Sequence, residues 1–197
     1  MSKRRELKRT ALLKVASEMF LANGYEGVSV DAVVEGAGGT KTNIYTIFGG
    51  KAQLFEAVVV QLCGAPLDGL TDLSGTSPAD VLREFGREYL AAAGGKHAIR
   101  LRRLVIAEAT RFPALGKLWL KSRPDVARAN VAAYLVGQGI SDAEARKLAG
   151  YFLGLLDIEL QRQLVGGSKA LSRREIDARV NDAVAFVLQG TKLDRRR

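Results

Sequence analysis

The sequence is poor in the residues that build disulfide frameworks and metal clusters. It holds one cysteine, Cys63, and one histidine, His97, among 197 residues. A single cysteine excludes an internal disulfide, and the two residues together exclude the usual zinc clusters. A Ser–His–Asp or a Cys–His arrangement would have to use this same histidine, so we expect no catalytic residues, no metal and no cofactor.

Proline and long apolar runs are scarce as well. There are four prolines, and the longest uncharged run, residues 129–141, falls short of the ~20 apolar residues that a membrane span needs. Charged residues interrupt the segment after the basic start of the chain, which is not typical of a signal peptide. With 47% hydrophobic and 26% charged residues, we expect a soluble cytoplasmic protein with a true core and no membrane partner.

Basic residues are in excess, with a net charge of +9 and a pI near 9.9. Such an excess favours a polyanionic partner, either nucleic acid or an anionic membrane surface. One basic cluster lies near the start of the chain and consists of Lys3, Arg4, Arg5, Lys8, Arg9 and Lys14. A second occupies residues 192–197, and we interpret it as a solvated basic tail.

The spacing of apolar residues is helical almost everywhere, which predicts an all-α fold. The first helix ends at Asn23-Gly24, a pair typical of a helix C-terminus. Its predicted core-facing stripe comprises Leu7, Ala11, Leu12, Val15, Ala16, Met19 and Phe20.

Two short helices follow, separated by glycines. Ser29 is placed to cap the first, residues 36–39 form a glycine-rich turn, and Thr40 is placed to cap the second, which runs to Ile47. A fourth helix begins after Gly49-Gly50 and breaks at residues 64–66. This order has the parts of a helix-turn-helix DNA reader, although the spacing alone is also compatible with a plain packing corner.

The rest of the chain predicts a larger helical body. Its first helix has a clear start at Ser77-Pro78, and its last two start at the predicted capping boxes Ser141 to Glu144 and Ser172 to Glu175. The helix after Ser141 is apolar over more than one face, so we expect part of its surface to meet a second subunit.

The first sixty residues contain an ordered set of residues in and around the two short helices: Phe20, Gly24-Tyr25, Ser29-Val30, Ala37-Gly38, Thr40 to Asn43, Ile44-Tyr45, Ile47-Phe48, Lys51 and Leu54-Phe55. With this set, residues 5–60 resemble the TetR family of bacterial transcription regulators. Three positions depart from the family pattern: Gly39 replaces a usual valine, Ile47 a usual aromatic residue, and Gly49-Gly50 a common Pro-Ser or Pro-Asn.

Residues of the second short helix are suited to DNA. The hydroxyls of Thr40, Thr42 and Tyr45 can bind phosphate oxygens, and Lys41 places a charge at the helix N-terminus. Asn43 can read an adenine edge, and Lys41 can alternatively reach a guanine. The resemblance implies that Lys51 is a phosphate clamp. The remaining predicted DNA contacts are Ser29, Arg4 and Arg5.

The resemblance also implies how the body works. It implies an effector-binding domain that dimerises through its last two helices, so that two heads read a palindromic operator and a small organic effector releases this repressor. Residues 104–115 and 152–155 resemble the C-terminal domain of the AefR-like subgroup. The predicted domains are therefore 1–63, with the helix-turn-helix at about 29–48, then 66–191, and the tail 192–197.

The effector pocket is predicted from residue type alone. Aromatic walls with one or two polar groups suit a drug-sized organic ligand, and the candidates are Phe85, Tyr89, Arg103, Trp119 and Tyr151. Two other interpretations stay open at this point. The chain could be a helical enzyme or small-molecule carrier whose helix-turn-helix is only structural, or a basic protein that binds a membrane surface.

Overall fold

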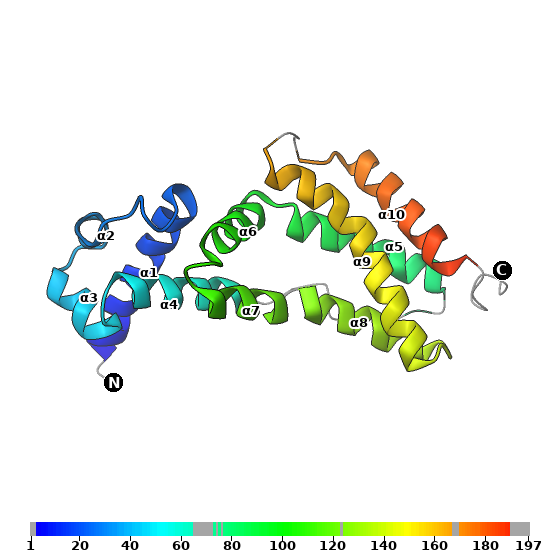
Figure 1. Ribbon diagram of the computed structural model, residues 1–197, viewed down its shortest axis with the longest axis horizontal. Helices are drawn as coiled ribbons and strands as arrows, with labels where there is room; N and C mark the ends of the chain where they lie inside the picture. Colours follow the sequence, from blue (N-terminus) through cyan, green and yellow to red (C-terminus); the bar gives the residue numbers. More distant parts are fainter. Residues whose placement is uncertain are drawn as a thin grey trace. The chain divides into compact units, whose positions relative to one another are not determined.

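The computed structural model describes residues 3–64, 73, 75, 77–122, 124–166 and 170–189, and all regular structure in this part of the chain is helical (Figure 1). The predicted all-α fold is thus confirmed. The helices are α1 (Lys3–Asn23), α2 (Val30–Ala37), α3 (Lys41–Phe48), α4 (Lys51–Cys63), α5 (Pro78–Ala93), α6 (Lys96–Glu108), α7 (Pro113–Ser122), α8 (Pro124–Gly137), α9 (Asp142–Leu164) and α10 (Arg173–Leu188). The predicted basic tail, residues 192–197, lies outside the described residues.

The chain divides into two compact units. The first unit contains α1 to α4 together with residues 100–120, and the second contains residues 66–99 and 121–197. Helix α6 therefore starts in the second unit and continues in the first. This is a division by packing, and the functional domains 1–63 and 66–191 stay a prediction.

The first unit has an apolar core to which six helices contribute. Phe20 of α1, Ile44 of α3 and Phe55 of α4 are fully buried there, and Leu104 of α6 and Leu115 of α7 belong to the same cluster. The Phe20 and Phe55 rings meet edge to face, with centroids 5.1 Å apart, an arrangement that aromatic pairs prefer. The α6–α7 segment thus contributes to the same core as α1 to α4.

The predicted core stripe of α1 was wrong in its first turns. Leu7 is 66% exposed, whereas Leu13, which was not in the stripe, is buried. The buried positions are Leu12, Leu13, Ala16, Ser17 and Phe20. The packed part of α1 therefore begins at its third turn, because α2 and α4 cover that part of the helix, and the first two turns present their side chains to solvent.

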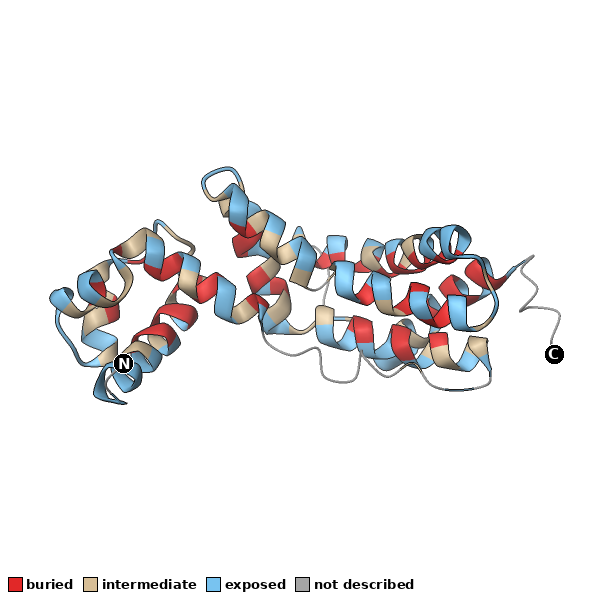
Figure 2. Ribbon diagram, turned by 90° about the horizontal axis from the view of Figure 1, so that it is seen from below, coloured by how far each residue is buried: buried red, intermediate tan, exposed pale blue. Residues whose placement is uncertain are grey.

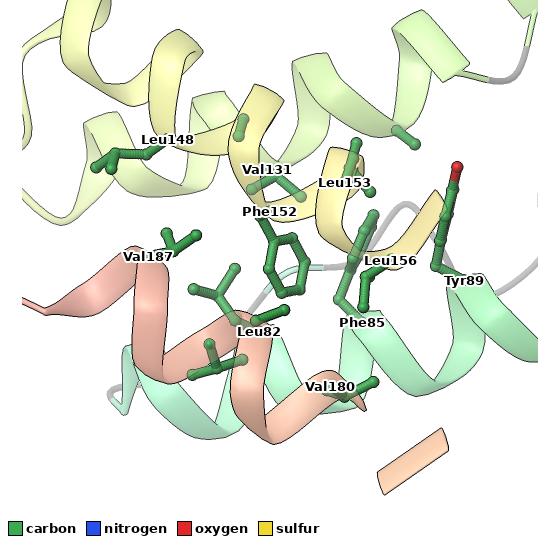
Figure 3. Packing of buried hydrophobic residues seen from close by; sticks show 14 of the residues in the cluster. Leu82, Phe85, Tyr89, Val131, Leu148, Phe152, Leu153, Leu156, Val180 and Val187 are labelled. Atoms are coloured by element: carbon green, nitrogen blue, oxygen red, sulfur yellow. The ribbon is translucent and has the colours of Figure 1, made fainter. Parts of the chain in front are cut away.

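The second unit is a bundle of α5, α8, α9 and α10 (Figures 1 and 3). Figure 3 shows Phe152 of α9 reaching between α5 and α10. Its ring leaves little room, since a Cβ on Gly86 of α5 would lie 3.2 Å from Phe152 Cζ and 2.9 Å from Val180 Cγ1. The glycine lets α5 approach α10 closely.

Helix starts in the second unit follow the predicted signals, with one correction. Ser77 and Ser172 both cap their helices, and the box at Ser172 is complete, because Glu175 also accepts the Ser172 amide at 2.8 Å. At α9 the Ser141 hydroxyl accepts the Glu144 amide at 3.4 Å, but the Glu144 carboxylate lies 3.9 Å from Lys147 Nζ. The predicted box at Ser141 is therefore only half formed, because a nearby cation attracts its acid.

Candidate nucleic-acid interface

The two short helices are joined by a tight left-handed turn. Ser29 caps α2, its hydroxyl accepting the Ala32 amide at 3.1 Å. Helix α2 ends at Gly38, whose φ of 67° and ψ of 83° suit glycine. Thr40 occupies the N-cap position of α3, but within the described residues its hydroxyl makes no capping bond. Thr40 is thus the N-cap at the predicted position, but it bonds the helix through its carbonyl, which accepts the Asn43 amide at 2.9 Å.

Helix α3 separates a buried from an exposed face. Ile44 is fully buried, and Phe48 is half-buried. The predicted DNA contacts Thr40, Lys41, Thr42 and Tyr45 are exposed, and Asn43 is half-buried. Figure 2 shows how exposed and buried positions follow one another along the helices. Tyr45 stands out because 58% of its surface is exposed, although its ring is large enough to fill a core position.

Lys41 is paired with an acid on the neighbouring helix. Its Nζ lies 2.7 Å from Asp31 Oδ1 in the first turn of α2, and this hydrogen bond, with the charge of Asp31, raises the pKa of Lys41. The pair explains how a cation sits at the N-terminus of α3, where the helix dipole disfavours it. Sequence reasoning missed Asp31, and a phosphate at Lys41 has to compete with this carboxylate.

The basic start of α1 lies beside α3. Arg4, Arg5 and Lys8 form an open cleft of about 420 Å³ together with Asn43, Thr46 and Ile47 of α3. Arg5 fixes this arrangement, because its Nη2 donates to the Thr46 carbonyl at 3.1 Å. The structure therefore brings the predicted residues Arg4 and Arg5 to Asn43, and it adds Lys8, which the charge cluster contained but which was not singled out.

Lys51, the first residue of α4, lies over an aromatic ring. Its Nζ is 4.4 Å from the Tyr25 ring centroid, and the Arg111 guanidinium lies 4.8 Å from the same centroid. Tyr25 is held in place by Phe55 and Phe112, each with its ring centroid 5.1 Å away. Both cations are attracted by the negative charge that the ring presents. Tyr25 thus holds Lys51 at the N-terminus of α4.

Glu26 neutralises part of this cluster. It accepts a hydrogen bond from Arg111 Nη1, and that bond and charge, with a smaller contribution from Lys51, hold the pKa of Glu26 below its ordinary value. The pKa of Arg111 is raised by the same bond. Sequence reasoning did not find Glu26 or Arg111 because they are 85 residues apart and have no shared motif.

Two of the predicted effector residues come together in the second unit. Phe85 and Tyr89 are almost fully buried, with ring centroids 6.3 Å apart. The Tyr89 hydroxyl donates to Asp157 Oδ1 of α9 at 2.8 Å. An acid on α9 thus bonds one of the two aromatic residues, and no sequence motif indicated this acid.

The other three predicted effector residues do not join this pair. Tyr151 is 48% exposed, and the Lys147 ammonium lies 5.8 Å from its ring centroid. Arg103 and Trp119 belong to the first unit, where Trp119 lies under the Arg102 guanidinium at 5.4 Å. The five residues were chosen for their chemistry, and side-chain type alone does not place them on one face.

The residues that the structure describes form neither a membrane-spanning helix nor a cluster of metal ligands. None of their helices is both long and apolar enough to cross a membrane. Nor do three of their histidine, cysteine, aspartate or glutamate side chains gather where they could hold a metal ion.

Comparison with known proteins connects both parts of the chain to one family. Residues 12–58 match the family of bacterial regulatory proteins named after tetR, and residues 80–190 match the C-terminal domain of AefR-like transcriptional repressors. No curated protein sequence matches the chain.

Solved structures agree with these matches. A protein of Mesorhizobium loti MAFF303099, assigned to the TetR family, is 25% identical with a TM-score of 0.83, over 95% of this chain and 98% of that one. The flavonoid-responsive regulator FrrA is 26% identical with a TM-score of 0.72, over 92% and 95%. A TetR regulator from Agrobacterium tumefaciens shares the fold at 22% identity, with a TM-score of 0.78 over 95% and 97%. Since the AefR-like match spans more than half of its length, the chain belongs to the TetR family of bacterial transcription regulators.

Proposed function

We propose that this regulator is a repressor that binds a palindromic operator as a homodimer and is released by a small organic effector. The observation that carries the DNA part is the exposed face of α3 beside the basic start of α1. Polar hydroxyls, an amide and several cations meet there, which is the chemistry that phosphates and base edges require. In this proposal the protein acts by binding in the bacterial cytoplasm and not as an enzyme.

The contacts divide into two kinds. Thr40, Thr42 and Tyr45 bind phosphates through their hydroxyls, and Ser29 contributes its exposed hydroxyl at the start of α2. The cations at Lys41, Lys51, Arg4 and Arg5 supply sequence-independent attraction, whereas Asn43 reads an adenine edge. Once its ion pair with Asp31 is broken, Lys41 either binds a phosphate or reaches a guanine.

The homodimer is proposed to form through α9 and α10. Three large apolar residues of these helices are about half exposed: Tyr151 at 48%, Ile158 at 54% and Phe186 at 59%. Tyr151 and Ile158 are seven positions apart, so they lie on one face of α9. An apolar face on two neighbouring helices is suited to a symmetric contact in which the same surface is used twice.

A matched pair of variants tests this interface. We expect Ile158→Glu to raise the dimer dissociation constant at least tenfold, because a charge would be buried without a partner. Ile106→Glu is the control, since Ile106 is equally exposed at 56% but lies on α6. Sedimentation of both variants over a range of concentrations measures their dimer dissociation constants. Equal constants for the two variants would mean that α9 is not part of the interface.

The effector site is proposed to include Phe85 and Tyr89, with Asp157 as the polar group that fixes orientation. Arg103, Trp119 and Tyr151 are weaker candidates on the geometry above. FrrA is a flavonoid-responsive regulator, and we therefore propose aromatic organic molecules as the first class to screen.

DNA flanking the protein's own gene tests the function as a whole. We expect the purified protein to bind this DNA in preference to an unrelated duplex, as a dimer, and with a steep dependence on salt. Aromatic compounds that lower this affinity would establish release by an effector. Binding that is equally weak on both duplexes would contradict the proposed operator, and a genome-wide pull-down would then show whether the protein reads DNA elsewhere.

A further inference from the structure

The cluster around Tyr25 contains two cations and one carboxylate. Lys51 and Arg111 both lie over the Tyr25 ring, and Glu26 hydrogen-bonds Arg111. Glu26 is also close enough to Lys51 for that charge to lower its pKa. Glu26 is therefore the one carboxylate of this cluster, and its position decides whether Arg111 or Lys51 is neutralised.

Glu26 and Arg111 come from the two regions that the family comparisons separate. Glu26 and Lys51 lie within the tetR match, residues 12–58, and Arg111 lies within the AefR-like match, residues 80–190. Arg111 lies three residues after the end of α6, and Phe112 next to it donates its amide to the Glu108 carbonyl at 2.8 Å and packs on Tyr25. The partner of Glu26 is thus tied to the last residue of α6 by a backbone hydrogen bond.

We propose that Glu26 is an exchangeable counter-ion: paired with Arg111 it leaves the Lys51 ammonium to a DNA phosphate, and released from Arg111 it neutralises Lys51. This rests on the proposed function, in which Lys51 binds a phosphate. The Tyr25 ring covers one side of the Lys51 ammonium. The N–H groups of this ammonium can still donate to a phosphate oxygen. Arg111 and Glu26 are then positioning residues that regulate the grip on DNA.

The exposure of the pair fits regulation better than stability. The Arg111 and Glu26 side chains are 51% and 70% exposed, and exposed ion pairs add little to the stability of a fold. An exposed carboxylate can change partners at low cost, whereas a buried one would be locked. Both bases adjoin the Tyr25 ring, and Glu26 is the next residue in the chain.

The experiment measures DNA affinity by fluorescence anisotropy at several salt concentrations, on a duplex of about three helical turns from upstream of the gene and on one of random sequence. Lys51→Gln should weaken binding roughly fivefold at about 0.15 M salt and lower the salt slope by about 0.9. Arg111→Gln should produce the same loss, because Glu26 then neutralises Lys51. Glu26→Gln should bind at least as well as the unmodified protein.

Two combinations separate charge exchange from a structural role. The double variant Glu26→Gln with Arg111→Gln should regain the original affinity and slope, and Arg111→Gln should cost nothing further in the Lys51→Gln background. Arg111→Lys keeps a cation for Glu26 and should bind normally. Arg128→Gln is the control for net charge, because Arg128 is 47% exposed and pairs with Asp125 at 3.0 Å. Thermal unfolding of each variant checks folding.

The outcomes distinguish the two proposals. If Lys51→Gln binds DNA like the original protein, Lys51 does not bind a phosphate, and the proposed exchange of Glu26 is overturned as well. If Lys51→Gln is weak but Arg111→Gln is normal, only the exchange is overturned. A loss in Arg111→Gln that Glu26→Gln does not restore also overturns it, because a purely structural arginine gives that result.

Discussion

The two compact units use polar side chains for different purposes. In the second unit, pairs such as Arg87 with Asp177 at 2.5 Å and Arg179 with Glu159 at 2.9 Å border an apolar core between α5, α9 and α10. In the first unit, Asp31 pairs with Lys41, a proposed DNA contact, and Glu26 pairs with Arg111, a proposed positioning residue for Lys51. Polar pairs thus border the packed core in one unit, and in the other they hold groups that we propose to act in DNA binding.

This difference predicts which variants change stability and which change binding. Phe152→Ala in the second unit should lower the free energy of unfolding by about 3–5 kcal/mol, because the ring is fully buried and its loss leaves a cavity. Urea denaturation measures this loss. Val165→Ala, at a position 87% exposed, should change stability by less than about 0.5 kcal/mol, and a similar loss in both variants would contradict the packing described here.

Close packing in the second unit makes one glycine sensitive. Gly86→Ala should cost about 1–3 kcal/mol, because the new Cβ would lie 2.9 Å from Val180 Cγ1 in a filled core. Gly116→Ala in α7 should instead gain roughly 0.5–1 kcal/mol, since its nearest contact would be an ordinary 3.7 Å and alanine favours helix. Thermal unfolding should therefore show a lower melting temperature for Gly86→Ala and a higher one for Gly116→Ala. A Gly86→Ala variant as stable as the unmodified protein would show that α5 and α10 can move apart.

Local signals in the sequence predicted much of the fold. Ser29, Ser77 and Ser172 mark helix starts because a cap bonds amides only two or three residues away. The same local information was incomplete at Thr40, which is the N-cap of α3 without a side-chain capping bond. It failed at Leu7, where helical spacing continues beyond the buried part of α1.

Partners distant in the sequence could not be predicted. Asp31 faces Lys41 only because the Gly38 turn folds α2 against α3, and Arg111 reaches Glu26 across 85 residues. The effector residues illustrate the same limit, since Phe85 and Tyr89 are one turn apart on α5, whereas Trp119 is in the other unit. Residue type indicates which chemistry is present, and only tertiary packing decides which groups meet.

In the first unit, variants at the α2–α3 pair should change binding and leave stability alone. Lys41→Gln should lower the salt slope of DNA binding by about one if Lys41 binds a phosphate. Asp31→Asn should do the reverse, strengthening binding to random DNA, because the carboxylate no longer competes with phosphate. Anisotropy titrations measure both, and equal slopes in the two variants would place Lys41 outside the interface.

The smallest expected effect concerns the caps of α9 and α10. The Ser172 hydroxyl and amide both bond Glu175 and lower its pKa from the ordinary 4.5. An acid whose pKa is lower in the folded state stabilises the fold above its unfolded pKa, and this stability is lost as the pH falls through the folded value. Ser172→Ala should therefore cost about 0.5–2 kcal/mol at pH ~7 and less under acid conditions.

Ser141→Ala provides the matched comparison for the capping box. Ser141 bonds the Glu144 amide by its hydroxyl alone, so the cost of its loss should be the same at neutral and at acid pH. Urea denaturation of both variants near pH 7 and near pH 4 gives the two differences. A loss at Ser172 that is equal at both pH values would mean that the Glu175 carboxylate adds nothing to the cap, and that the complete and the half-formed box stabilise their helices in the same way.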